Sequence, residues 1–267
     1  MAEQSGEPVI LRSREGSVAT VTMNRPQRGN SLTTQLKSAL RESLEEVSAD
    51  ETIRAVILTG AGSTFCVGQD LNEHAQALLR DPTAAFATIH EHYNPIVTAL
   101  STMPKPVIAA INGACVGAGL GFALACDLRV AATSATFATA FTGIGLSCDS
   151  GLSVSLARAV GAARASELLL LNEKLTASRA AELGIVGEVV PPEQLPETAR
   201  TLANRLAAGP TLAYAEIKRA LATAWRQPLH DVLNAEAQAQ TRLGHTIDHR
   251  AAVEAFQKKT TPTFTGQ

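Results

Sequence analysis

The feature that most constrains the fold is a long stretch that carries almost no charge. Between residues 106 and 148 the only charged side chains are Asp127 and Arg129. Its first part, 106–126, is long enough to meet the ~20-residue length of a membrane-spanning helix. However, Asn112 and Gly113 lie inside that run, and an Asn-Gly pair is typical of a turn. We therefore expect a buried strand followed by a short core helix, with no membrane insertion.

The remaining composition fits a protein with a sizeable core of its own. Of the 267 residues 45% are hydrophobic, and the formal net charge is -2. This near balance argues against a nucleic-acid partner, which would need a basic face. The four cysteines, Cys66, Cys115, Cys126 and Cys148, form no C-x-x-C pair and suit reduced thiols. Met1–Pro8 lacks the basic and apolar regions of a signal peptide, so we expect a cytoplasmic location.

Hydrophobic periodicity predicts alternating strands and helices, followed by a helical end. Apolar residues at helical spacing indicate a helix over 33–49, with Ser31 or Thr33 as its cap. The β-α-β alternation is typical of an α/β domain with right-handed crossovers. The helical end could form a second subdomain or serve assembly. The predicted strands are 9–12, 17–23, 54–59, 107–111, 128–132 and 188–190; the predicted helices are 33–49, a weaker one over 82–101 with a kink at Pro95, 120–126, 199–206, 212–225, 232–243 and 251–256.

Common cofactor and nucleophile motifs do not fit. Gly117, Gly119 and Gly121 suggest a dinucleotide fingerprint, but its third glycine would fall on Phe122 or Leu124. The chain has no G-K-[ST] phosphate loop and no G-x-S-x-G nucleophile elbow. The sequence therefore argues against a common nucleotide-binding protein and against a serine hydrolase.

One histidine pair could suggest a metal. His245 and His249 would share one face of a helix, as metal-binding pairs do. No third ligand is evident in the sequence, so a polar surface of a late helix is favoured. We predict no metal site and no separate cofactor.

Two loops that follow buried strands could bring backbone N–H groups together. One is 65–70, and the other leads from Asn112-Gly113 to a helix that starts near Ala118. A helix N-terminus has unpaired N–H groups and the positive end of the helix dipole, and small residues let a carbonyl approach closely. One N–H from each loop could form an oxyanion hole. The alternative is that the glycines serve only tight packing of helix on strand.

Several segments together carry a resemblance to a known family. They are 24–26 with 30–32, 65–71, 105–113, 117–119, 125–131, 181–186 and 264–266. Through them the chain resembles the crotonase superfamily, the enoyl-CoA hydratases and isomerases, over essentially its whole length. The resemblance implies a spiral ββα core over 1–200 and a helical region over 201–267 that builds trimers, often paired into hexamers. It also implies an acyl-CoA thioester substrate, of which coenzyme A is a part.

The resemblance also assigns residues to roles. It implies an oxyanion hole formed by the N–H groups of Gln69 and Ala118, which stabilises an enolate; one such donor is typically worth roughly 3–4 kcal/mol. Lys258, or its neighbour Lys259, is expected to meet a nucleotide phosphate, sometimes across a subunit boundary. For the basic residues the alternative is an ordinary solvated charge. The residues implied to contact substrate or coenzyme A are Arg25, Arg28, Asn30, Ser31, Leu32, Val67, Gly68, Asp70, Tyr93, Gly117, Phe141 and Lys258.

The sequence distinguishes between reactions of this family. Its hydratases use two glutamates to activate water and to handle the α-proton, and ungapped spacing places Gly121 and Phe141 at those positions. Neither can transfer a proton. One carboxylate, Asp149, remains at the end of the weakly charged stretch. Its position resembles the catalytic aspartate of the phenylacetate-pathway ring-epoxide/enoyl-CoA isomerase and of 4-chlorobenzoyl-CoA dehalogenase. The dehalogenase's catalytic histidine would fall on Asn94, which favours the isomerase.

We therefore expect an isomerase in which Asp149 shuttles a proton along an acyl chain held on Gln69 and Ala118. Desolvation beside an apolar pocket would raise the pKa of this carboxylate and make it a better base. Three alternatives stay open: a pure N-cap role for Asp149 on a helix beginning at Ser150, an enoyl-CoA hydratase with an unidentified water-positioning residue, and a non-catalytic acyl-CoA binder. The segment 147–152 departs from the isomerase pattern, which leaves the shape of the pocket open.

Overall fold

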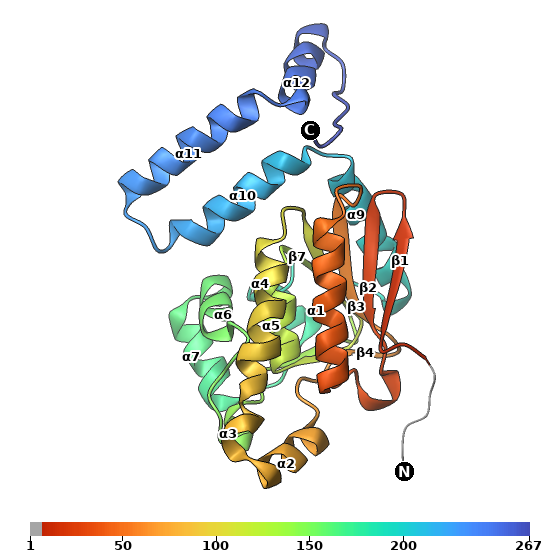
Figure 1. The fold of residues 1–267 in the computed structure, drawn as a ribbon, viewed down its shortest axis with the longest axis vertical. Helices are drawn as coiled ribbons and strands as arrows, with labels where there is room; N and C mark the ends of the chain where they lie inside the picture. Colours follow the sequence, from red (N-terminus) through yellow and green to blue (C-terminus); the bar gives the residue numbers. More distant parts are fainter. Residues whose placement is uncertain (1–6) are drawn as a thin grey trace.

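A large, mostly parallel sheet forms the centre of the computed structural model, which describes residues 7–267 (Figure 1). The first two strands pair antiparallel and every other pair is parallel. The central strands are buried on both faces, as parallel strands covered by helices must be. We expect no signal peptide in Met1–Pro8, and residues 1–6 of that segment lie outside the described residues. In spatial order the strands are β1 (Ile10–Glu15), β2 (Val18–Met23), β3 (Ala55–Gly60), β5 (Val107–Ile111), β7 (Leu128–Ala132) and β10 (Glu188–Val190).

A second, smaller sheet lies beside the first. Its strands are β4 (Thr64–Cys66), β6 (Ala114–Val116), β8 (Thr136–Ala138) and β9 (Leu175–Thr176). Each of β3, β5 and β7 in the large sheet is followed directly by a strand of the small sheet and then by helix. This repeated ββα unit is the predicted α/β spiral, and the prediction is confirmed. The repeat brings the segments after β4 and β6 to the same edge, because those two strands pair in parallel.

Helices cover both faces of the large sheet. On one face lie α1 (Thr34–Ala49), α4 (Asn94–Thr102) and α5 (Ala118–Ala125). Thr33 caps α1 by accepting a hydrogen bond from the N–H of Leu36, so of the two candidate caps it is Thr33. On the other face α9 (Leu195–Ala207) packs its buried residues against the sheet along its whole length. The expected domain boundary between residues 200 and 201 therefore lies inside one continuous helix.

The remaining helices of the core are short. The weakly helical segment over 82–101 consists of α3 (Pro82–Ala85), a π-helical turn η2 (Ile89–Tyr93) and α4. Pro95 lies in the first turn of α4, directly after the π-helical turn η2 that ends at Tyr93. The others are α2 (Leu71–Arg80), α6 (Leu152–Val160), α7 (Ala162–Leu171), α8 (Ala177–Glu182) and the 3-10 turns η1 (Pro26–Arg28), η3 (Thr142–Ile144) and η4 (Pro192–Gln194).

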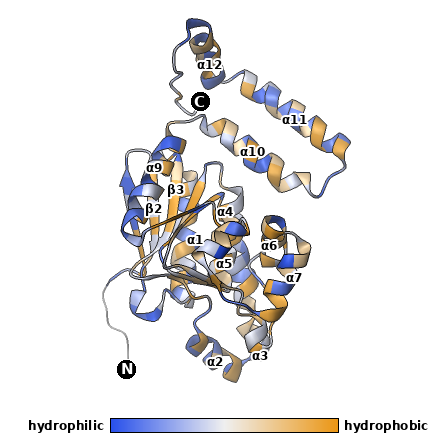
Figure 2. Cartoon of the chain, turned by 180° about the vertical axis from the view of Figure 1, so that it is seen from behind, coloured by the Kyte–Doolittle hydropathy of each residue, from blue (hydrophilic) through white to orange (hydrophobic). Residues whose placement is uncertain are grey.

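The last three helices reach away from the core (Figures 1 and 2). A short ion pair of 2.7 Å between Lys218 Nζ and Asp127 Oδ2 ties α10 to the sheet. Large apolar side chains remain uncovered on this region, with Trp225 73% and Leu229 72% exposed. No helix within residues 7–267 is long and apolar enough to cross a membrane. The three are α10 (Thr211–Ala224), α11 (Leu229–Gly244) and α12 (Ile247–Lys258).

Candidate active site

A cavity of about 410 Å³ lies at the edge where the two predicted loops meet. Its volume falls within the range of small-molecule sites, and its wall is largely apolar with a few polar groups, as such sites are. Most of the residues predicted for the site line this one cavity. Those residues are Arg28, Ser31, Val67, Gly68, Gln69, Asp70, Tyr93, Gly117, Ala118, Phe141 and Asp149.

Two backbone N–H groups are available at this edge. Leu32 forms a parallel bridge with the 65–70 loop: its N–H donates to Gly68 O (2.8 Å), and its carbonyl accepts from the N–H of Asp70 (3.3 Å). The N–H of Gln69, between them, points away from that bridge. Ala118 is the first residue of α5, so its N–H has no acceptor inside the helix and stands at the positive end of the dipole. One N–H from each loop therefore lies at this edge outside these backbone pairings, so the predicted oxyanion hole is compatible with the local geometry.

Two glycines make the close approach of these loops possible. Gly68 has φ +86, and a Cβ added to it would lie 3.1 Å from the carbonyl oxygen of Val116 and 3.6 Å from the nitrogen of Ala118. Gly117, the residue before α5, has φ 57 and ψ -124, a conformation that glycine adopts readily and other residues avoid. The backbone of one loop thus lies against the start of the helix with no side chain between them.

Asp149 lines the cavity together with Ala118 and Phe141. The alternative role as an N-cap is wrong, because α6 begins at Leu152 with Gly151 as its N-cap and receives no side-chain cap hydrogen bond. Burial raises the pKa of Asp149 above its ordinary value, and a hydrogen bond from the neighbouring hydroxyl opposes this. A carboxylate with a raised pKa is better matched to taking up and releasing a proton near neutral pH.

The two positions of the hydratase glutamates hold no acid in this cavity. Gly121 lies in α5, and an ideal Cβ at this position would be 2.5 Å from the Cβ of Ser150 and 2.8 Å from its carbonyl oxygen. The space for a side chain at 121 is therefore filled. The second position is Phe141, which contributes an apolar wall.

The other carboxylate of the cavity wall, Asp70, is engaged in holding the 65–70 loop. It accepts from the N–H of Glu73 (3.1 Å) as the N-cap of α2, from the Ser31 hydroxyl (2.9 Å) and from Arg25 (3.2 Å). Although burial acts to raise it, the pKa of Asp70 is lowered by these hydrogen bonds. A carboxylate stabilised in its ionised form is a poor proton shuttle, so Asp70 serves the architecture of the loop.

A buried polar network that the sequence analysis missed stands behind Gln69. Lys37 is only 1% exposed, and its Nζ donates to Thr88 Oγ1 (2.5 Å) and to Gln69 Oε1 (3.3 Å). The hydroxyl of Tyr93 donates to the same amide oxygen, and Lys37 Nζ lies 5.3 Å from the centre of the Tyr93 ring. Burial lowers the pKa of Lys37. The network holds the side chain of Gln69, which belongs to the 65–70 loop.

Four predicted contact residues do not line the cavity. Arg25 donates to Ser31 and Asp70. Asn30 and Leu32 have no exposed surface: the Asn30 side chain donates to the carbonyl oxygens of Ala61 and Thr64, and the Leu32 backbone pairs with the 65–70 loop. Lys258 lies on α12, at the opposite end of the molecule from α2 (Figure 1), and its side chain pairs at 3.6 Å with Glu254. Their proposed contacts with coenzyme A stay predictions.

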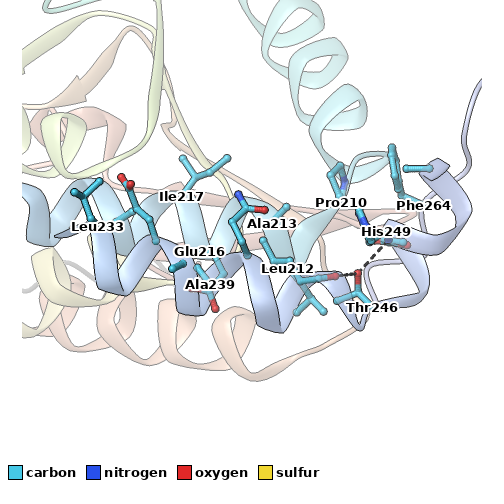
Figure 3. Close-up of a pocket in the computed structure, with 17 residues that line it drawn as sticks. Pro210, Leu212, Ala213, Glu216, Ile217, Leu233, Ala239, Thr246, His249 and Phe264 are labelled. Carbon is cyan, nitrogen blue, oxygen red and sulfur yellow. Dashed lines mark hydrogen bonds between the residues drawn. The ribbon is translucent and has the colours of Figure 1, made fainter. Parts of the chain in front are cut away.

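A second cavity, of about 670 Å³, lies between α10, α11 and α12 (Figure 3). Its wall is mainly apolar, and its carboxyl residues are Glu216, Glu236 and Asp248. Glu216 is paired with Arg219 (2.7 Å) and Arg242 (3.0 Å), and Asp248 accepts from the N–H groups of Thr265 and Gly266. The His249 N–H donates to the Thr246 hydroxyl as a helix cap (3.1 Å). Residues 7–267 contain no cluster of three or more His, Cys, Asp or Glu that could hold a metal ion. None of the residues predicted to bind or act on the thioester lines this cavity.

Known proteins resemble this chain over nearly its whole length. A family model described as enoyl-CoA hydratase/isomerase matches residues 13–267. The chain is 42% identical to 1,2-epoxyphenylacetyl-CoA isomerase of Escherichia coli K12, covering 97% of this chain and 98% of the relative. It is 40% identical to a Rhodobacter capsulatus protein named "Probable enoyl-CoA hydratase", covering 94% and 95%. A crystal structure of an enoyl-CoA hydratase from Bacillus anthracis superimposes with a TM-score of 0.90 at 33% identity, covering 97% and 100%.

Proposed function

The chain belongs to the enoyl-CoA hydratase/isomerase family, and on that premise we propose that it is an isomerase of enoyl-CoA or ring-epoxide acyl-CoA thioesters. The observation that carries the proposal is that Asp149 lies in one cavity with Gln69 and Ala118, while the positions of both hydratase glutamates hold Gly121 and Phe141. One carboxylate is enough to move a proton between two carbons. Adding water across a double bond needs a further group to activate that water.

The N–H groups of Gln69 and Ala118 bind the thioester carbonyl oxygen. Negative charge develops on that oxygen when a proton leaves the acyl chain, so the two donors stabilise the enolate more strongly than the substrate. The helix dipole of α5 acts in the same direction because Ala118 stands at its positive end. The Lys37 network keeps the Gln69 side chain out of the acyl space by binding its amide oxygen.

Asp149 then acts as the proton carrier. Its carboxylate takes a proton from the acyl carbon; the C–H bonding pair becomes part of the dienolate, and the same group returns the proton to another carbon. Phe141 contributes an apolar wall to the same cavity. A ring-epoxide substrate is supported by the similarity to the isomerase from Escherichia coli.

A panel of three thioester classes tests the proposal. Wild type and Asp149→Asn are assayed with 2-enoyl-CoA, 3-enoyl-CoA and a ring-epoxide acyl-CoA, following double-bond migration, hydration and ring isomerisation separately. We expect isomerisation by wild type and a loss of about 10²–10⁴-fold in kcat for the variant. Robust hydration by wild type would instead favour a hydratase, and binding without turnover would favour an acyl-CoA binder.

Assembly and location are further proposals. The uncovered apolar side chains of α10 and α11, such as Leu221 and Leu229, support a homotrimer or a hexamer in which other subunits cover them. Lys258, on the neighbouring α12, could then reach coenzyme A bound to another subunit. A cytoplasmic location stays a prediction.

A further inference from the structure

The residue that follows Asp149 has an unusual backbone conformation. Ser150 has φ 51 and is 2% exposed. A residue other than glycine is therefore held in the left-handed backbone region inside the core. Such a conformation is unfavourable for residues other than glycine and persists only where the surroundings impose it. Here the surroundings are α5: the Ser150 Cβ and carbonyl oxygen occupy the space beside Gly121.

The hydroxyl of Ser150 has a defined task. It donates a hydrogen bond of 2.8 Å to Oδ1 of Asp149. Ser150 itself does not line the cavity, whereas Asp149 does. The left-handed turn therefore keeps the hydroxyl on the carboxylate while Ser150 stays outside the cavity wall.

We propose that Ser150 is a positioning residue that holds Oδ1 of Asp149 and leaves Oδ2 as the oxygen that carries the proton. The proposal rests on the isomerase function above and adds a residue to it. A hydrogen bond to the ionised carboxylate stabilises that form, so Ser150 limits how far burial alone would favour protonation. Oδ2 accepts the proton from the acyl carbon, the carbon keeps the bonding pair as dienolate, and the O–H bond breaks when the proton returns. Ser150 keeps its own proton throughout.

Other groups near the carboxylate must be considered when its titration is measured. The titratable or charged side chains that line the same cavity are Arg28, Asp70 and Tyr93, and Cys148 precedes Asp149 in the chain. Of these, Tyr93 is coupled to it, since burial and the charge of Asp149 both raise the pKa of Tyr93. Tyr93 is thus neutral over the range in which Asp149 titrates.

The test compares Ser150→Ala with a matched control, Ser155→Ala. Ser155 lies on the exposed side of α6, where its hydroxyl only donates to Gly151 O (3.0 Å). In Ser150→Ala we expect kcat to fall on the order of tenfold, KM to stay within about twofold because the residue does not touch the cavity, and the acid limb of the kcat profile to move to higher pH. The control should match wild type in all three quantities.

A second variant keeps the test decisive if stability changes. Ser150→Gly removes the same hydroxyl but suits the left-handed backbone, so we expect the same displacement of the pH profile in a protein at least as stable as Ser150→Ala. If both variants keep the wild-type kcat and pH profile while Asp149→Asn is inactive, Ser150 has no positioning role and the isomerase proposal survives. If Asp149→Asn is itself fully active, the proposed function fails whatever Ser150 does.

Discussion

Replacing Gly121 with alanine adds one methyl group at the point where α5 meets the Asp149 turn. The new Cβ would stand 2.5 Å from the Ser150 Cβ and 2.8 Å from its carbonyl oxygen, whereas carbon atoms in contact prefer about 3.5–4.0 Å. Part of the structure must therefore move by about 1 Å. Overpacking of this kind costs about 1–3 kcal/mol, and contact with main-chain atoms favours the upper part of that range.

A gain in helix propensity opposes this cost. Alanine is more favourable than glycine inside a helix by about 1 kcal/mol. We therefore expect Gly121→Ala to lower the free energy of unfolding by about 1–2 kcal/mol, which corresponds to a Tm lower by roughly 5 °C. Glutamate at the same position, the change that would restore a hydratase acid, should be still less stable and should gain no hydration activity.

The assay is urea unfolding followed by far-UV circular dichroism at one fixed protein concentration, since an assembly makes stability concentration-dependent. Gly244→Ala is the matched control: the residue is the last of α11, and a Cβ there would meet nothing within 4 Å. We expect that control to be as stable as wild type or slightly more so. Combining Gly121→Ala with Ser150→Gly should recover part of the loss. The packing argument is refuted if Gly121→Ala is as stable as Gly244→Ala.

Further predictions concern pH and the support of the site. Burial raises the pKa of Asp149, so the folded protein binds this proton more tightly than the unfolded chain does. The group therefore stabilises the fold below about pH 3.8, and this contribution is lost as the pH rises through the folded pKa. Asp149→Asn should unfold at a higher urea concentration than wild type at pH 7 and lose that advantage in acid. Burial lowers the pKa of Lys37, so the stability of wild type relative to Lys37→Met should increase as the pH rises towards 10.5, measured by thermal unfolding across that range. Arg25→Ala should lower the free energy of unfolding by up to about 3 kcal/mol, because it leaves the poorly exposed Asp70 carboxylate without its cation; a change confined to the KM for acyl-CoA, with unaltered urea unfolding, would contradict this.

Elements with strong periodicity could be predicted from the sequence almost to the residue. The strand at 107–111 and the helix at 33–49 agree with β5 and α1, because a continuous apolar run and a 3.6-residue repeat are unambiguous signals. The strands of the small sheet contain two or three residues each, too few to show any alternation. The helix α2 follows a glycine-rich loop and has no buried residue, so its sequence lacks a core-facing stripe.

The cavity could be predicted only in part. The loop residues Gln69 and Ala118 follow from motifs, but the roles of Lys37 and Ser150 depend on tertiary contacts. Lysine is rarely buried, although Lys37 lies three residues before Leu40 on the apolar face of its helix, which is a signal that could have been noticed. The conformation of Ser150 depends on the missing side chain at Gly121, and no local pattern connects those two positions.

The central claim is that one carboxylate and two N–H groups carry out the reaction, and proton transfer tests it most directly. The measurement is the kcat for conversion of a 3-enoyl-CoA to the 2-enoyl-CoA in D₂O by wild type and Asp149→Asn, with thioester binding measured for both. We predict that wild type isomerises and incorporates some deuterium at the chain carbons, because the proton held by Asp149 can exchange with solvent before it returns. The variant should bind the thioester but lose both activities by about 10²-fold or more. A variant that isomerises and exchanges at the wild-type rate would contradict the account.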